Sequence, residues 1–87
     1  MDALDLHFLN ALAHLRDRKV EEALREIGLM QARQPENGKA KWLEAKILHK
    51  FLKEFARAEE LYKQAMRLEP SLEGVLVDYA ELLVRLE

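Results

Sequence analysis

An internal repeat is the feature of this sequence that most restricts its fold. When the chain is compared with itself at an offset of 35 residues, residues of similar kind coincide at many positions. The matched pairs are Val20 and Phe55, Ala23 and Ala58, Ile27 and Tyr62, Met30 and Ala65, His14 and His49, and Pro35 and Pro70. A repeat of this length corresponds to one supersecondary unit, so we expect the chain to consist of stacked copies of one unit.

The repeated unit has the pattern of two amphipathic helices folded back on each other. Its second half carries apolar residues three or four positions apart, which lie on one face of a helix. In the second copy these are Phe55, Ala58, Leu61, Tyr62, Ala65 and Leu68, and the first half repeats the spacing with Trp42, Ala45, Leu48 and Leu52. A single hairpin cannot bury both faces of its helices, so each unit needs a neighbour of the same kind.

Several of these positions match a known repeat family. In the second copy they are Trp42, Ala58, Tyr62, Ala65 and Pro70, and in the first copy Ala11, Ala23 and Pro35. This pattern resembles the tetratricopeptide repeat, whose period is about 34 residues. The resemblance implies one all-α domain over residues 1–87, a right-handed superhelix of about five antiparallel helices. Its first repeat covers about 4–38, its second about 39–72, and a capping helix about 73–86.

The same resemblance implies which residues pack the repeats together. In the last helix, Leu76, Tyr79, Ala80 and Leu83 are expected to pack. The full predicted packing set is Ala11, Ala23, Ile27, Pro35, Trp42, Ala45, Ala58, Tyr62, Ala65, Pro70, Tyr79 and Ala80. We also expect Gly28 to mark a close approach by a neighbouring helix, and Gly38 to supply a left-handed residue in the turn after Pro35.

Two registers are open for the first helix of the second repeat. The family places a small residue where the two helices of a repeat cross. Counting back from Ala58 puts Lys46 there and keeps Trp42 in its usual place, whereas counting 34 residues from Ala11 puts Ala45 there. The second count requires one extra residue in the turn near 51–53. We favour it, because a lysine at the crossing would hold the two backbones apart.

Composition argues against catalysis, metal binding and nucleic-acid binding. The chain has no cysteine or threonine and one serine, so it offers few nucleophiles and no disulfide or thiolate metal site. The three histidines lack metal-ligand spacing and are interpreted as structural. The net charge of −2, with both signs interspersed, does not fit a nucleic-acid footprint. The basic cluster at 16–19 is interpreted as cations at a helix C-terminus. We therefore predict no catalytic residue, no metal and no cofactor.

The expected function is protein binding in a concave groove lined by the first helices of successive repeats. The expected groove residues are Phe8, Leu12, Arg16, Leu43, Ile47, Phe51, Val77 and Val84, with Trp42 and Lys46 entering in the alternative register. The best-known groove of the family binds a C-terminal carboxylate. Its matching positions here hold Phe8, Leu12, Glu44, Gly74 and Asp78, so we expect no such clamp. The expected guest is an apolar peptide or an amphipathic helix of a partner protein.

Two alternatives remain open. The groove or the final helix could close a homodimer. The segment VLVDYAELL (75–83) also resembles the helix that closes the repeat domain of bacterial cytochrome c maturation factors, which would imply an apocytochrome helix as guest. The sequence has no apolar run of about 20 residues and no basic n-region at its start, so membrane insertion is not expected and the cytoplasm is the default location.

Overall fold

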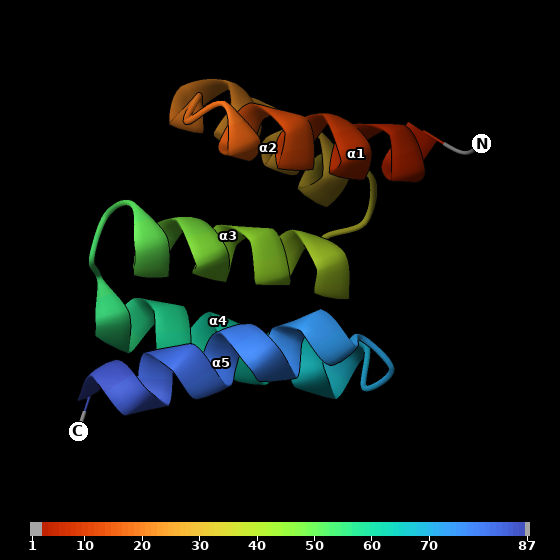
Figure 1. Ribbon diagram of the computed structural model, residues 1–87. Coiled ribbons are helices and arrows are strands. Elements are labelled where there is room, and N and C mark those ends of the chain that lie inside the picture. Colours follow the sequence, from red (N-terminus) through yellow and green to blue (C-terminus); the bar gives the residue numbers. More distant parts are fainter. Residues whose placement is uncertain (1–2, 87) are drawn as a thin grey trace.

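Five α-helices make up residues 3–86, the part of the chain that the computed structural model describes (Figure 1). They are α1 (Ala3–Arg16), α2 (Val20–Arg33), α3 (Gly38–Lys50), α4 (Phe55–Leu68) and α5 (Glu73–Leu86). The all-α class and the number of helices predicted from the repeat are confirmed. No helix among these residues has the length and apolar character needed to span a membrane.

Local sequence signals explain where the helices begin and end. Asn37 caps α3, because its side-chain oxygen accepts a hydrogen bond of 2.9 Å from the backbone N–H of Ala40. Helices α2 and α4 both stop two residues before a proline. The residue between, Gln34 or Glu69, is extended, with φ near −146° and −144°. The ring of the following proline disfavours the helical conformation at that position.

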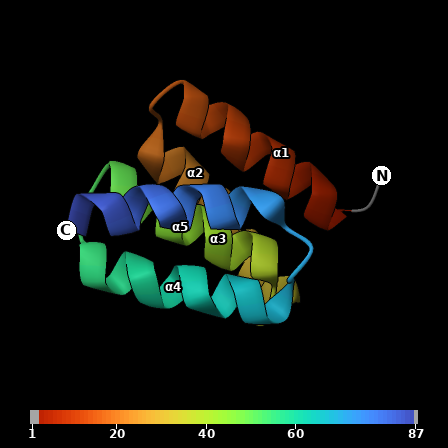
Figure 2. The same ribbon diagram turned by 60° about the horizontal axis from the view of Figure 1, so that its bottom comes forward.

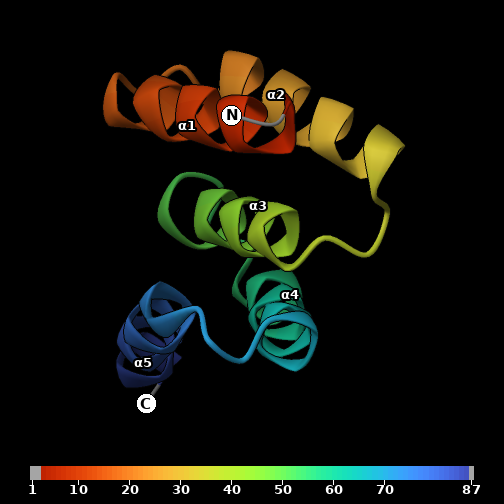
Figure 3. The ribbon, with the colours of Figure 1, turned by 90° about the vertical axis from the view of Figure 1, so that its right-hand side faces the viewer.

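The helices pack mainly with their neighbours in sequence. α1 pairs with α2 and α3 with α4, while α5 packs against α4 (Figure 2). Helix α3 also contacts α1, α2 and α5, and Figure 3 shows it between the first hairpin and the α4–α5 pair. Helices α1, α3 and α5 run in the same direction, so their C-terminal ends lie on the same side of the molecule (Figure 1).

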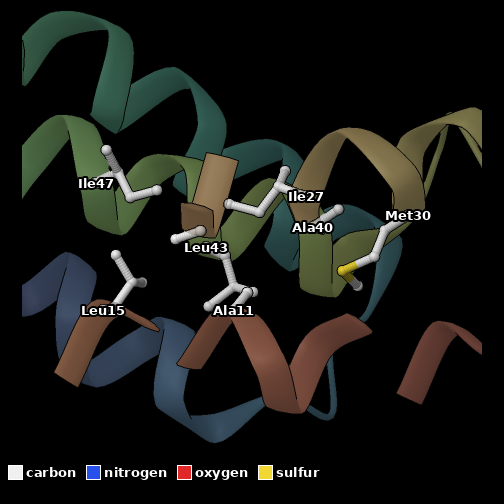
Figure 4. Packing of buried hydrophobic residues seen from close by; sticks show 8 residues of the cluster. Ala11, Leu15, Ile27, Met30, Ala40, Leu43 and Ile47 are labelled. Carbon is white, nitrogen blue, oxygen red and sulfur yellow. The ribbon is translucent and has the colours of Figure 1, made fainter. Parts of the chain in front are cut away.

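The core consists of two apolar clusters that share α3. The first lies between α1, α2 and α3 (Figure 4) and contains Ala11, Leu15, Ala23, Ile27, Met30, Ala40, Leu43 and Ile47. The second lies between α3, α4 and α5 and contains Ala45, Leu48, Ala58, Tyr62, Ala65, Val75 and Leu82. Since α3 supplies buried residues to both clusters, it is covered on two sides.

The register of α3 has Ala45 at the packed position. Ala45 is completely buried, as is Ala11, which lies 34 residues earlier. Lys46 lies at the surface, where its ammonium group approaches Asp78. The turn between α3 and α4 spans residues 51–54, one residue longer than the turn 17–19 between α1 and α2. This extra residue changes the offset from 34 in the first helices to 35 in the second.

The predicted roles of two glycines are wrong. A Cβ on Gly28 would meet no atom within 4 Å, so no helix approaches there. Gly38 is the first residue of α3 and does not have a positive φ. The close approaches are at Gly38, beside Glu69, and at Gly74, beside the Trp42 ring. The left-handed residues of the described chain are Arg18 and Lys53, with φ of 61° and 59°.

Most of the predicted packing set is placed in the core, with one clear exception in α5. Seven of its residues are buried, namely Ala11, Ala23, Ile27, Ala45, Ala58, Tyr62 and Ala65. Trp42 and Tyr79 are half-buried against the second cluster, and Pro35 and Pro70 are exposed in turns. Ala80 is exposed, as are Leu76 and Leu83. Helix α5 instead packs through Val75, Asp78 and Leu82, because among residues 3–86 only α3 and α4 contact it.

Candidate functional site

A cavity of about 360 Å³ opens between the C-terminal halves of α1 and α3. Its apolar wall comes from Leu12, Leu15 and Phe51. Its polar wall consists only of cationic side chains, and these are Arg16, Arg18, Lys46 and Lys50. The cavity exists because the parallel helices α1 and α3 end together here and carry long basic side chains at their last turns.

A second cavity, of about 490 Å³, lies between the ends of α3 and α5. It is lined by His49, Lys50, Lys53, Glu81, Val84 and Arg85. Lys50 borders both cavities, so the two are neighbours. Together they collect six of the fourteen lysines and arginines of the chain and one carboxylate, Glu81. We call the lining residues of these two cavities the basic surface.

Asp78 of α5 lies beneath the basic surface and contacts two of its lysines. Its side chain is buried, with 9% of its surface exposed. One carboxylate oxygen accepts a hydrogen bond of 2.7 Å from the indole N–H of Trp42 and lies 3.5 Å from the Lys46 ammonium. The other oxygen lies 3.8 Å from Lys50, which is also 3.2 Å from Glu81. These contacts tie α5 to α3.

Aromatic rings hold three of the cations in place. The Arg18 guanidinium lies 5.8 Å from the centre of the Phe51 ring, and the Lys46 ammonium lies 5.5 Å from that of Trp42. The Arg85 guanidinium lies 5.5 Å from the centre of the Phe55 ring. Such cation–π contacts favour a fixed position over the ring. A cation–π contact leaves the charge in place, so Arg18 and Arg85 remain able to meet an anionic group, whereas Lys46 is paired with Asp78.

His49 lines the second cavity and contacts a buried tyrosine, Tyr62. His49 is buried, and its Nδ1 lies 2.9 Å from the hydroxyl of Tyr62. Burial lowers the pKa of His49 below its ordinary value, and the charge of Lys50 acts in the same direction. Burial raises the pKa of Tyr62 far above its ordinary value. The pKa of Tyr79 is also raised, first by burial and then by its hydrogen bond to Glu59.

No metal site is found within residues 3–86, where no three His, Cys, Asp or Glu side chains are grouped closely enough to bind an ion. The histidine at 49 is a core residue that stacks edge-on against Phe55 and Tyr62. His7 instead pairs with Glu26 across α1 and α2, at 2.5 Å. A third cavity, between α3 and α4, has mixed charge, with Glu44, Arg57 and Glu60 among its lining residues.

Four of the predicted groove residues line the two cavities, and the others lie elsewhere. Leu12, Arg16 and Phe51 line the first cavity, and Val84 lines the second. Phe8 is half-buried, with its ring centre 6.0 Å from that of Trp42.

Two other groove residues, Leu43 and Ile47, need correction. Leu43 and Ile47 are completely buried in the first cluster and offer no surface to a guest, because their side of α3 packs against the first hairpin. Val77 is exposed on α5 and lines neither cavity, so its contact with a partner stays a prediction.

Sequence reasoning placed Arg16 in the groove but missed Arg18, Lys50 and Lys53 of the basic surface. Lys46 entered only through the alternative register, and Arg18 was interpreted with its neighbours as a helix-end cluster. Lys50 and Lys53 lie near the end of α3, far from Arg18 in sequence. The signal that could have found them is the parallel direction of α1, α3 and α5, which brings the three helix ends together.

Comparison of the chain with models of protein families, with curated proteins and with solved structures finds no match.

Proposed function

We propose that this chain is a tetratricopeptide-like protein-interaction module, a right-handed superhelix that binds an apolar peptide or an amphipathic helix of a partner and catalyses no reaction. The observation that carries the proposal is the pair of neighbouring cavities between the parallel helices α1, α3 and α5. Leu12, Phe51 and Val84 give these cavities an apolar wall. Contact between alternate helices, α1 with α3 and α3 with α5, supports the repeat architecture.

The test is peptide binding measured by fluorescence anisotropy. The probe is a labelled amphipathic helix with a leucine stripe, about four turns long. We expect Leu12→Ala and Phe51→Ala each to weaken binding about tenfold, equivalent to ~1.4 kcal/mol, because each removes apolar contact area from the cavity. The matched controls are Leu24→Ala and Leu29→Ala, which truncate exposed leucines of α2 and should leave affinity unchanged.

Val84→Gln separates binding from folding. Val84 is 70% exposed, so its replacement does not disturb the core, yet it lines the second cavity. A loss of affinity with an unchanged circular dichroism spectrum supports the proposal. Binding that is unaffected by all three cavity variants would place the peptide elsewhere and overturn it.

A second candidate function is self-association through α5. This helix exposes a run of large apolar side chains, namely Leu76, Val77, Leu83, Val84 and Leu86. Exposed apolar patches are common at protein interfaces. Sedimentation velocity at several concentrations tests the candidate: a dimer that Leu76→Glu with Leu83→Glu converts to monomer supports it, and a monomer at all concentrations removes it.

A further inference from the structure

We propose that the segment bound by the basic surface is acidic as well as apolar, an amphipathic peptide whose carboxylates flank the apolar side chains that enter the cavities. This inference rests on the proposed function and names the chemistry of the partner. It departs from the expectation drawn from the family's clamp positions. The cations that carry it lie at other positions, at the C-terminal ends of three helices.

Charge is the first argument. The chain as a whole has a net charge of −2, yet the basic surface holds six cations and one carboxylate. Lys46 and Lys50 are already paired with Asp78 and Glu81. The other four are available to a guest. Arg18, Lys53 and Arg85 form no ion pair with any described residue. Arg16 has only a 3.8 Å contact with Asp17, in which both side chains are mainly exposed.

The helix ends alone do not account for this surface. Cations near a helix C-terminus interact favourably with the helix dipole, and the ammonium of Lys53 does donate to the Lys50 carbonyl at 3.2 Å. The helix dipole explains one cation at the end of one helix. It does not explain why Arg16, Arg18 and Lys46 surround an apolar cavity that has no acidic lining residue.

The backbone at Arg18 supplies a second, independent argument. Arg18 closes α1 in the left-handed conformation: its N–H donates to Leu15 O, and the N–H of Lys19 donates to His14 O. This is the hydrogen-bond pattern in which glycine is strongly preferred. Lys53 has the same conformation at the end of α3. At both places a long cation that lines a cavity occupies a position where glycine would be more stable, as expected when a side chain is retained for binding.

The apolar walls favour a peptide over a nucleic acid. Leu12, Leu15 and Phe51 form one side of the first cavity, and Val84 lies in the second. A polyanion that tracks phosphates needs a uniformly basic face and little apolar contact. Most of the acidic residues lie outside the basic surface and would repel such a polymer. A peptide with both carboxylates and leucines can contact the cations and the apolar side chains of the cavities at the same time.

The experiment compares three labelled helical peptides that share one leucine stripe and carry glutamate, glutamine or lysine at the polar positions. We expect the glutamate peptide to bind about tenfold more tightly than the glutamine peptide, and the lysine peptide to bind weakest. The advantage of glutamate should shrink as salt is raised. Arg18→Gly should weaken binding of the glutamate peptide and raise the melting temperature of the protein. A purely structural arginine would not produce these opposite effects. The control is Arg67→Gln, an exposed arginine on α4.

Each outcome decides the inference. Equal affinity for the glutamate and glutamine peptides overturns it but leaves the proposed function standing. Failure of all three peptides to bind overturns both. If a single-stranded or double-stranded oligonucleotide binds more tightly than the glutamate peptide, the inference is overturned and the partner is a nucleic acid. Unchanged peptide affinity in Arg18→Gly removes the role assigned to that cation.

Discussion

At the scale of single residues, Gly74 shows how closely α5 approaches α3. A Cβ at this position would lie 2.6 Å and 2.7 Å from two carbons of the Trp42 ring. The indole is held in place because its N–H donates to Asp78. The ring therefore cannot swing away without breaking that hydrogen bond. Gly28 is the opposite case, a helical glycine with open space around it.

We predict opposite effects of alanine at these two glycines. Gly74→Ala should lower the free energy of unfolding by ~1–3 kcal/mol, since the added methyl group overpacks a well-filled contact. Gly28→Ala should raise it by ~0.5–1 kcal/mol, because alanine has the higher helix propensity and restricts the unfolded chain. Urea unfolding of both variants measures the difference. Stabilisation by Gly74→Ala would show that Trp42 is not held where the structure places it.

His49 gives a prediction for pH. The pKa of this side chain is lower in the folded protein than its ordinary value of 6.5, so the unfolded chain binds the proton more readily. The stabilisation due to neutral His49 is present above pH 6.5 and is lost as the pH falls through the folded-state value. Urea unfolding between pH 7.5 and 5 should show stability falling toward acid. In His49→Gln the fall should be smaller, whatever the change in absolute stability. An unchanged slope would contradict this.

At the scale of elements, the docking of α5 depends on a buried carboxylate as well as on apolar packing. Asp78 lies between Trp42, Lys46 and Lys50, all on α3. Tyr79 stacks on Tyr62 with ring centres 5.8 Å apart and donates to Glu59, which joins the same helix to α4. The orientation of α5 is therefore fixed by polar contacts on two sides.

We predict that Asp78→Ala loosens α5 specifically. Removing the carboxylate leaves the Trp42 N–H without its acceptor, and a lost hydrogen bond to a charged group costs about 1.5–3 kcal/mol. Trp42 is the only tryptophan of the chain, so its fluorescence reports on this contact directly. The spectrum should shift and the urea midpoint should fall. Asp17→Ala, which removes an exposed carboxylate, serves as control and should change neither.

The elements were largely predictable from the sequence, and their outer faces were not. Helical spacing and the two prolines determine the five helices, and the choice between Ala45 and Lys46 follows from steric size alone. The packed face of α5 could not be derived in the same way. Leu76, Ala80 and Leu83 have correct helical spacing for packing, but spacing does not tell whether a neighbour exists to cover them. The prediction that Leu43 and Ile47 line a groove was wrong for the reverse reason, since α3 is covered on both sides.

The candidate site was predictable in its apolar part and, among its cations, at Arg16. Leu12 and Phe51 belong to an apolar pattern that one sequence can reveal. The cations of the basic surface come from three helix ends that are about 34 residues apart in the chain, and each end alone has an ordinary explanation through the helix dipole. Their grouping is a property of helix direction and register. It follows from the arrangement of the helices in space.

At the scale of the whole molecule, α3 makes the domain one cooperative unit. It provides Leu43 and Ile47 to one apolar cluster and Ala45 and Leu48 to the other. We therefore predict a single unfolding transition. The urea midpoint from Trp42 fluorescence, which reports on α3 and α5, should coincide with that from circular dichroism, which reports on all helices. Two separated midpoints would mean that the hairpins unfold independently.

The shared position of α3 also has a consequence for how a bound guest would be detected. A peptide seated between α1 and α3 makes no contact with α4, yet it stabilises a helix on which α4 depends. Backbone amides of α4 that exchange with deuterium only through global opening should therefore slow down as much as those under the peptide. Protection from exchange would therefore extend over the entire domain. The residues that contact the peptide would have to be identified from changes in their side-chain NMR signals instead.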